Sequence, residues 1–243
     1  MPEGPSIVIA KEDMELFKGK KIIEVSGNSK VDIQRLKNKK ILDIKTWGKH
    51  LLICFSGFTV RIHFMLFGTY RVNERKESPP RLSLKFAKGE LNFYTCSVQF
   101  IEEDLDDVYD WSGDIMNPAW DPKAAIRKLK KHPKMEVCDA ILDQSIFAGA
   151  GNIFKNEVLF RIAVHPESKV GALPPKKLKE FVDETHNYSF EFLEWKKAYI
   201  LKKKWLAHTK KTCPRCDIPF TKEYLGKGKR RSYFCTNCQV LYE

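Results

Sequence analysis

Four cysteines near the end of the sequence have the spacing of metal ligands. Cys213 and Cys216 form one CxxC pair, and eighteen residues later Cys235 and Cys238 form a second. Two such pairs place four thiolates at the corners of a tetrahedron, the geometry that Zn²⁺ adopts in closed structural sites. The alternative, a pair of disulfides, needs an oxidising compartment, whereas residues 1–20 show no apolar signal segment. The pattern predicts one structural zinc ion and a reducing compartment.

The segment between the cysteine pairs is predicted to be a β-hairpin with a basic tip at residues 226–231. The whole chain has 43 Lys and Arg residues against 31 Asp and Glu residues, and residues 196–231 alone contain thirteen basic and two acidic residues. Cations along a phosphate backbone release condensed counterions, so this clustering predicts a nucleic-acid partner. For Lys202, Lys203 and Lys204, a solvated basic surface remains the alternative.

The first residues place a secondary amine next to a carboxylate. Removal of Met1, expected before a small residue, frees the nitrogen of Pro2, and Glu3 follows. Such an amine is partly unprotonated near neutral pH and attacks an aldehyde-like carbon, giving an iminium that acts as a cationic electron sink. Glu3 is a candidate general acid or base. The alternative is structural, because proline commonly opens a helix.

The following segments are predicted to hold these groups in place. Ile7, Ala10, Met14 and Phe17 recur at helical spacing, so a helix is expected to anchor the start of the chain. From residue 21 to 102 the apolar period changes to two, with short β-rich runs at residues 22–25, 40–44, 51–55, 59–63, 69–72, 82–86 and 91–94. These runs predict a β-sandwich or barrel.

Two basic side chains and an apolar loop stand out among the predicted strands. Lys49 follows Gly48 in a turn, where it either reaches out of the sheet or is an ordinary surface residue. His63 ends a strand and is followed closely by the apolar loop residues Met65, Leu66 and Phe67. A lone histidine is usually structural. An apolar loop beside DNA-binding charge nevertheless suits a wedge that fills the space left by an extruded base.

The second half of the sequence predicts helices. Residues 103–120 form an acidic linker, Asp121 and Pro122 cap and open a helix, and residues 136–147 and 175–201 have helical apolar patterns. Between them, a glycine-rich turn at residues 149–151 opens a helix at Asn152. Backbone N–H groups at such a helix start bind phosphate, although a tight turn between two helices needs the same glycines.

These elements predict an α+β protein of several domains. The predicted divisions are a β-sandwich with an N-terminal helix (residues 1–105), a linker (106–120), a helical domain (121–205) and a zinc-finger hairpin (206–243). A chain of 243 residues is long enough for two modest cores. No apolar run reaches the roughly 18 residues of a membrane span, so no membrane partner is expected.

At this point the motifs resemble those of the formamidopyrimidine-DNA glycosylase/endonuclease VIII family. The resemblance covers the whole chain. It rests on the start Met-Pro-Glu-Gly-Pro, on Gly48-Lys49 before a strand, on Gly149-Ala-Gly151-Asn152-Ile153 with Glu157, and on a terminal four-cysteine finger with Arg230 five residues before Cys235. The resemblance implies that residues 149–157 belong to a helix–two-turns–helix element.

The resemblance also implies a function and a set of roles. The protein would be a DNA glycosylase and abasic-site lyase of base excision repair, acting on damaged double-stranded DNA as a monomer. Pro2 would attack C1′ of the damaged nucleoside, Glu3 would protonate the opening sugar, and Lys49 would assist near the phosphate and sugar. The iminium would drive β,δ-elimination. The expected DNA contacts are His63, Asn152 and Arg230 to phosphates, and Met65, Leu66 and Phe67 in the vacated stack.

Two features favour the endonuclease VIII branch, which acts on oxidised pyrimidines. Residues 95–99 lack the Arg-x-Phe pair that the purine branch inserts opposite the lesion, and the segment between Trp195 and Cys213 is short for a loop that closes over an oxidised guanine. The chain departs from the family pattern at Ser6, where the family usually has Glu, which bears on base handling more than on strand cleavage. Ala150 in place of Leu or Val is a milder departure.

Three alternatives remain at the level of sequence. The oxidised-purine branch differs only in the base removed. A non-catalytic zinc-finger protein would bind DNA without covalent chemistry, and an RNA-binding zinc ribbon would leave Pro2 and Glu3 without a role. The expected location is the cytoplasm, at the nucleoid, for a bacterial protein and the nucleus for a eukaryotic one.

Overall fold

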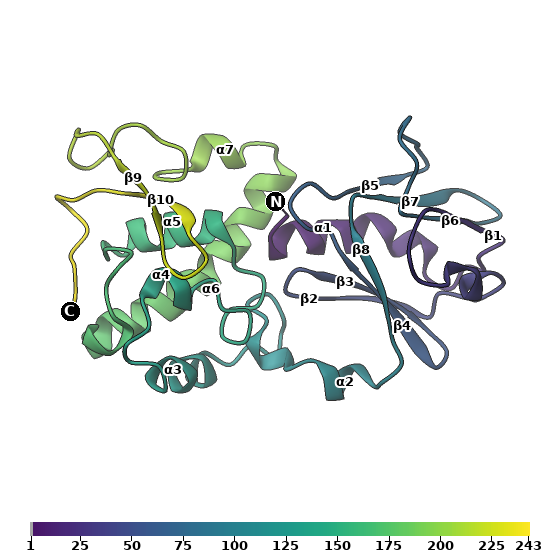
Figure 1. The fold of residues 1–243 in the computed structure, drawn as a ribbon, viewed down its shortest axis with the longest axis horizontal. Helices are drawn as coiled ribbons and strands as arrows, with labels where there is room; N and C mark the ends of the chain where they lie inside the picture. The colour runs from purple at the N-terminus through teal and green to yellow at the C-terminus, as the bar shows by residue number, and fades with distance from the viewer. Residues whose placement is uncertain (1) are drawn as a thin grey trace. The chain divides into compact units, whose positions relative to one another are not determined.

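In the computed structural model, which describes residues 2–243, the chain divides into two units, one ending at Asp110 and the other beginning at Trp111 (Figure 1). The first unit contains two four-stranded antiparallel sheets with strand orders β2-β3-β4-β8 and β1-β6-β7-β5. The strands are β1 (Glu24–Ser26), β2 (Asp43–Trp47), β3 (His50–Phe55), β4 (Phe58–His63), β5 (Thr69–Val72), β6 (Leu82–Lys85), β7 (Glu90–Tyr94) and β8 (Ser97–Ile101).

One hydrophobic core joins these two sheets, because each contributes its buried apolar side chains to a single cluster. The helix α1 (Gly4–Met14) adds Ile7, Ala10 and Met14 to the same core and contacts β2, β3 and β5. The helix is thereby anchored to both sheets, as the apolar spacing predicted. A 3-10 turn, η1 (Glu15–Phe17), follows it. Two further short elements, η2 (Ile33–Leu36) and α2 (Leu105–Val108), complete the unit.

The second unit is mainly helical, with a two-stranded hairpin near its end. Its longest helix, α6 (Pro175–Lys197), packs against α5 (Asn152–Arg161), with Phe154 of α5 contacting the rings of Tyr188 and Phe192. The remaining elements are η3 (Trp111–Gly113), α3 (Pro122–Lys130), α4 (Val137–Ala140), η4 (Val170–Ala172), α7 (Leu201–Lys204), β9 (Thr221–Leu225) and β10 (Arg230–Phe234).

The α+β class, with a β-sandwich, a helical region and a terminal four-cysteine hairpin, is confirmed. Asp121 caps α3 as predicted, since its side chain accepts a hydrogen bond of 2.8 Å from the Lys123 N–H. Residues 136–147 form only the single turn α4, and the last long helix ends at Lys197 rather than near Leu201. Arg230 and Arg231 belong to a strand and not to the hairpin tip. The finer domain boundaries stay a prediction.

Within the part of the chain that the structure describes, none of the helices combines the length and the apolar character needed to cross a membrane. The predicted removal of Met1 concerns a residue outside that part.

Candidate functional site

The buried carboxylate of Glu3 is the most unusual feature of the first unit. Glutamates are seldom fully buried, yet Glu3 is only 1% exposed. It takes the N-cap position of α1 with an extended backbone, and its carbonyl accepts a hydrogen bond of 2.7 Å from the Ser6 N–H. Pro5 opens the helix that follows. The Glu3 side chain is therefore fixed at the start of this helix.

Lys49 lies at the tip of the hairpin between β2 and β3. Trp47 pairs with His50, so Gly48 and Lys49 form a two-residue turn in which Gly48 has a φ of 53°, a conformation that glycine adopts without strain. In the next pair of strands His50 lies opposite His63. The positive charge of Lys49 therefore acts on His63: burial is the main cause that lowers the pKa of His63, followed by Lys49 and Arg61. Two of the predicted site residues thus share one end of this sheet.

His50 packs against His63, and its ring is uncharged at pH 7. Its Nδ1 is 3.1 Å from the hydroxyl of Tyr109, and its ring contacts His63 edge-on. Burial, together with the charges of Arg61, His63 and Lys49, lowers the pKa of His50 to about 4. The His50 ring therefore supports the β2–β3 hairpin without adding a charge.

This shift predicts a specific acid sensitivity. Because the folded pKa of His50 lies below its unfolded value of about 6.5, the unfolded chain binds more protons between pH 6.5 and 4, so stability falls as pH falls through this window. We expect protonation of His50 to lower the free energy of unfolding by about 3 kcal/mol across this pH range. Urea unfolding of His50→Gln at pH 7, 5.5 and 4.5 should show a correspondingly flatter profile, and exposed His132→Gln serves as the control. Equal profiles for His50→Gln and wild type would contradict the assignment.

The loop after β4 presents three apolar side chains to solvent. Met65 and Leu66 are about half exposed and Phe67 is 75% exposed. The loop is a tight turn: the Gly68 N–H donates to the Phe64 carbonyl at 2.7 Å, and a Cβ at Gly68 would come within 2.1 Å of that oxygen. Phe64 itself is buried against Tyr70 and Phe93, anchoring the turn. The turn between Phe64 and Gly68 therefore holds the side chains of Met65, Leu66 and Phe67 toward solvent.

In the second unit, Asn152 and Arg230 come close together through the backbone of β10. Asn152 begins α5, and its Nδ2 donates to the carbonyl of Arg231 at 3.1 Å. The Arg230 side chain is exposed at the start of β10. The predicted glycine-rich turn thus leads into a helix whose first residue contacts the finger hairpin.

The residues after Asn152 clamp the hairpin more tightly than sequence reasoning anticipated. Lys155 is 1% exposed, and its Nζ donates to the carbonyls of Arg230 and Arg231 at 3.1 and 3.4 Å and to Ser232 Oγ at 2.7 Å. Burial lowers the pKa of Lys155 to about 8. Asn156 Oδ1 accepts from the Tyr233 N–H at 2.9 Å. Four successive residues of β10, from Arg230 to Tyr233, are therefore attached to α5.

Glu157 attaches α5 to a second segment, residues 206–208, which leads to the first cysteine pair. It is fully buried, and its carboxylate accepts hydrogen bonds from the backbone N–H groups of Leu206, Ala207 and His208 at 2.9, 3.0 and 2.7 Å. The signal available in the sequence was the polar run Lys155-Asn156-Glu157 between apolar Phe154 and Val158, which is unusual in a buried helix.

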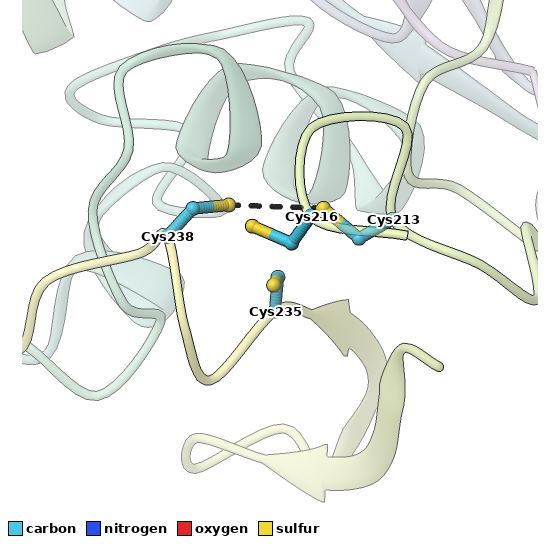
Figure 2. A group of neighbouring side chains, drawn as sticks. All are labelled: Cys213, Cys216, Cys235 and Cys238. Atoms are coloured by element: carbon cyan, nitrogen blue, oxygen red, sulfur yellow. Dashed lines mark hydrogen bonds between the residues drawn. The ribbon is translucent and has the colours of Figure 1, made fainter. Parts of the chain in front are cut away.

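The four predicted cysteine ligands converge at the base of the hairpin. Cys213 and Cys216 precede β9, Cys235 and Cys238 follow β10, and Figure 2 shows the four side chains gathered together. Their sulfur atoms all lie within 4.8 Å of one another. The sulfurs of Cys213 and Cys238 are 3.7 Å apart. A tetrahedron with metal–sulfur bonds of about 2.3 Å has edges of about 3.8 Å, so the four thiols suit a metal such as Zn²⁺. Asn237 Nδ2 donates to Cys216 Sγ at 3.2 Å, as expected of a group supporting a ligand sulfur.

Comparison with known proteins identifies the family and the fold of this chain. The model of the formamidopyrimidine-DNA glycosylase N-terminal domain matches residues 1–100, and that of the H2TH domain of the same glycosylases matches residues 113–200. The structure of Lactococcus lactis formamidopyrimidine-DNA glycosylase bound to DNA containing an abasic site has the same fold, with a TM-score of 0.86 over 98% of this chain and 99% of that one, at 22% identity.

The chain is also similar to curated relatives in animals and bacteria. Endonuclease 8-like 3 from mouse is 30% identical over 81% of this chain, and formamidopyrimidine-DNA glycosylase from Lactobacillus helveticus is 25% identical over the full length of both chains. This chain spans about a third of the length of the endonuclease 8-like 3 relatives. The protein belongs to the formamidopyrimidine-DNA glycosylase/endonuclease VIII family.

Proposed function

We propose that this protein is a DNA glycosylase and abasic-site lyase that removes oxidised bases, with pyrimidines favoured. The observation that carries the proposal is the buried carboxyl group of Glu3 directly after Pro2, at the start of a helix anchored in the sandwich core. Burying an acidic side chain costs free energy, which a functional role for Glu3 would explain. Family membership supports the same conclusion.

In the proposed mechanism, the Pro2 nitrogen forms a bond to C1′ of the damaged nucleoside while the bond from C1′ to the base breaks, and the departing base takes up the proton that this nitrogen loses. Glu3 gives its proton to the ring oxygen as the sugar opens, and the product is an iminium on the Pro2 nitrogen. The iminium acidifies C2′, whose proton is lost as the 3′ phosphate leaves. A second elimination releases the 5′ phosphate, and hydrolysis frees the amine.

Lys49 and His63 are proposed to bind the phosphate and sugar beside the reacting carbon. They share one end of a sheet, and Lys49 adds positive charge there. The exposed side chains of Met65, Leu66 and Phe67 would enter the stack where the damaged base leaves it, since apolar wedges lower the cost of an extruded nucleotide.

Asn152 and Arg230 are proposed as phosphate contacts from the second unit. Arg230 is exposed, whereas the Asn152 amide already donates to β10, so its second N–H would serve the DNA. The four cysteines would hold one structural Zn²⁺ that keeps this hairpin folded. The proposed partner is damaged double-stranded DNA, bound by a monomer, in the nucleoid of a bacterium or in a eukaryotic nucleus.

The preferred base is tested by direct measurement of base release. Matched duplexes carrying thymine glycol, 5-hydroxyuracil or 8-oxoguanine are incubated with the protein, and the freed base is quantified by mass spectrometry. We expect faster release of the two pyrimidines. Faster release of 8-oxoguanine would assign the protein to the purine branch. Binding without release or cleavage of any duplex would support the non-catalytic alternative.

Lys155 is predicted to act on DNA binding through Arg230. Lys155→Met keeps most of the side-chain volume but removes the donor to the Arg230 and Arg231 carbonyls. The first residues of β10, including Arg230, should then be held less firmly against α5. We expect about a 10-fold loss of duplex affinity, as for the loss of one charged hydrogen bond. Exposed Lys176→Met is the matched control for the loss of one charge.

A double variant separates positioning from direct contact. If Lys155 acts by holding Arg230, adding Lys155→Met to Arg230→Ala should cost little further affinity. Independent, multiplying losses of affinity would contradict this role.

A further inference from the structure

One tyrosine in the second unit is almost completely exposed. Tyr199, two residues after the end of α6, is 95% exposed, far more than any other large apolar or aromatic residue in the described chain. Within residues 2–243, its ring and hydroxyl make no hydrogen bond or ring contact with another side chain. The side chain therefore contributes no packing energy to the fold.

The backbone at Tyr199 adopts a conformation that a tyrosine disfavours. Its φ is 59°, in the left-handed region. The Ile200 N–H donates to the Trp195 carbonyl at 2.9 Å and the Tyr199 N–H to the Lys196 carbonyl at 3.1 Å. These two bonds define a Schellman motif, in which Tyr199 takes the position usually occupied by glycine. The chain therefore keeps a large aromatic residue where glycine would fit better.

The sequence on both sides of Tyr199 is strongly basic. Residues 196–204 contain five lysines and no acidic residue, and Lys202, Lys203 and Lys204 of α7 are exposed. Exposed aromatic rings among cations are the features by which proteins bind single-stranded nucleic acid, because bases stack on the ring while phosphates contact the charges. An unpacked, strained residue is also a recognised mark of a functional position.

We propose that Tyr199 is a stacking platform for an unpaired nucleobase of DNA, with the lysines of α7 contacting the adjoining phosphates. The proposal rests on the proposed function, in which DNA is the polymer that the protein binds. It adds a contact for unpaired nucleotides in single-stranded or locally opened DNA. No step of the cleavage chemistry depends on it.

The strain at Tyr199 makes a sharp test possible. Tyr199→Gly removes the ring and also relieves the left-handed strain, so its thermal midpoint should equal or exceed that of wild type. Its affinity for a fluorescent single-stranded thymidine oligomer should fall by about 5- to 150-fold, the range for loss of one stacked base. Tyr199→Phe should stay within about twofold, because the ring is kept.

Two controls isolate the base and the ring. Thr209→Gly changes another exposed residue of positive φ in the same unit without removing a ring, and it should bind as wild type does. An oligomer of the same length with abasic sugars carries the phosphates alone, so Tyr199→Gly should bind it as wild type does. Replacing Lys202, Lys203 and Lys204 by alanine should weaken binding to both oligomers and reduce the salt dependence.

The proposal is overturned if Tyr199→Gly keeps wild-type affinity for the thymidine oligomer, or if it loses as much affinity for the abasic oligomer. It is also overturned if wild type does not bind the thymidine oligomer, or binds the corresponding RNA more tightly. Borohydride trapping on an abasic duplex, run alongside, reports on the lyase separately. If wild type forms the cross-link and Tyr199→Gly binds the thymidine oligomer as wild type does, only the stacking platform is rejected. If Tyr199→Gly loses affinity for the oligomer and wild type forms no cross-link, only the lyase is rejected.

Discussion

Blocking the amine of Pro2 should reduce strand cleavage at abasic sites by about 10³-fold or more, as expected when the nucleophile of a covalent mechanism is lost. A chain extended by Gly-Ser ahead of Pro2 turns this amine into an amide, whose nitrogen is not nucleophilic. This change keeps the Pro2 ring and the helix start intact. It tests the nucleophile more cleanly than Pro2→Ala, which leaves a reactive primary amine. Cleavage is measured on a duplex with one preformed abasic site.

The matched control is Glu3→Gln, which keeps the amine and the shape of the buried side chain. Since Glu3 is proposed to protonate the opening sugar, this variant should lose base removal while retaining part of the cleavage at a preformed abasic site. Both altered proteins should bind the duplex with wild-type affinity. Undiminished cleavage by the extended chain would contradict the role of Pro2.

Removal of metal from the four-cysteine site should have the second large effect. Only a small hydrophobic cluster surrounds the cysteines, formed by Phe220, Ala207 and Phe160 of α5, and the proposed ion would join the segment before β9 to the segment after β10. Without the ion this segment should unfold locally, releasing Arg230 and lowering duplex affinity by about 100-fold or more, because structural zinc supplies much of the folding energy of such fingers. Calorimetric or fluorescence titration measures the affinity.

Metal analysis gives the companion result. Native protein should contain one Zn²⁺ per chain, and Cys235→Ala should contain none. Cys96→Ala, which removes a buried cysteine outside the four-cysteine site, should keep the metal and the affinity. A Cys235→Ala protein with full metal content and normal DNA affinity would contradict the assignment.

The parts of the fold that sequence predicts well are those controlled by local patterns. The period-two runs predict strands because burial on one face of a sheet follows alternation, and Asp121 with Pro122 predicts a helix start because both effects act within one turn. The cysteine spacing predicts that the four thiols come together, because binding one metal ion brings the two CxxC pairs to the same place. Each of these signals lies in a few neighbouring residues.

The contacts that sequence did not predict join residues distant in the chain. Lys155 and Glu157 look like ordinary charged helix residues, and only the placement of β10 and residues 206–208 against α5 gives them buried partners. The helix α6 ends earlier than its apolar pattern predicts, because Tyr199 takes a helix-ending conformation usually associated with glycine. The paired placement of Lys49 and His63 follows from strand register, which no short motif specifies.

The most direct test of the central proposal is borohydride trapping on a duplex with one abasic site, followed by mass mapping of the cross-linked peptide. Reduction converts an iminium into a stable amine, so the bond between protein and sugar survives digestion. We predict one adduct per chain, on the nitrogen of a Pro2 that has become the first residue. Duplex binding without any adduct would contradict the lyase mechanism, and an adduct on Lys49 would move the nucleophile from the chain end to the β2–β3 turn.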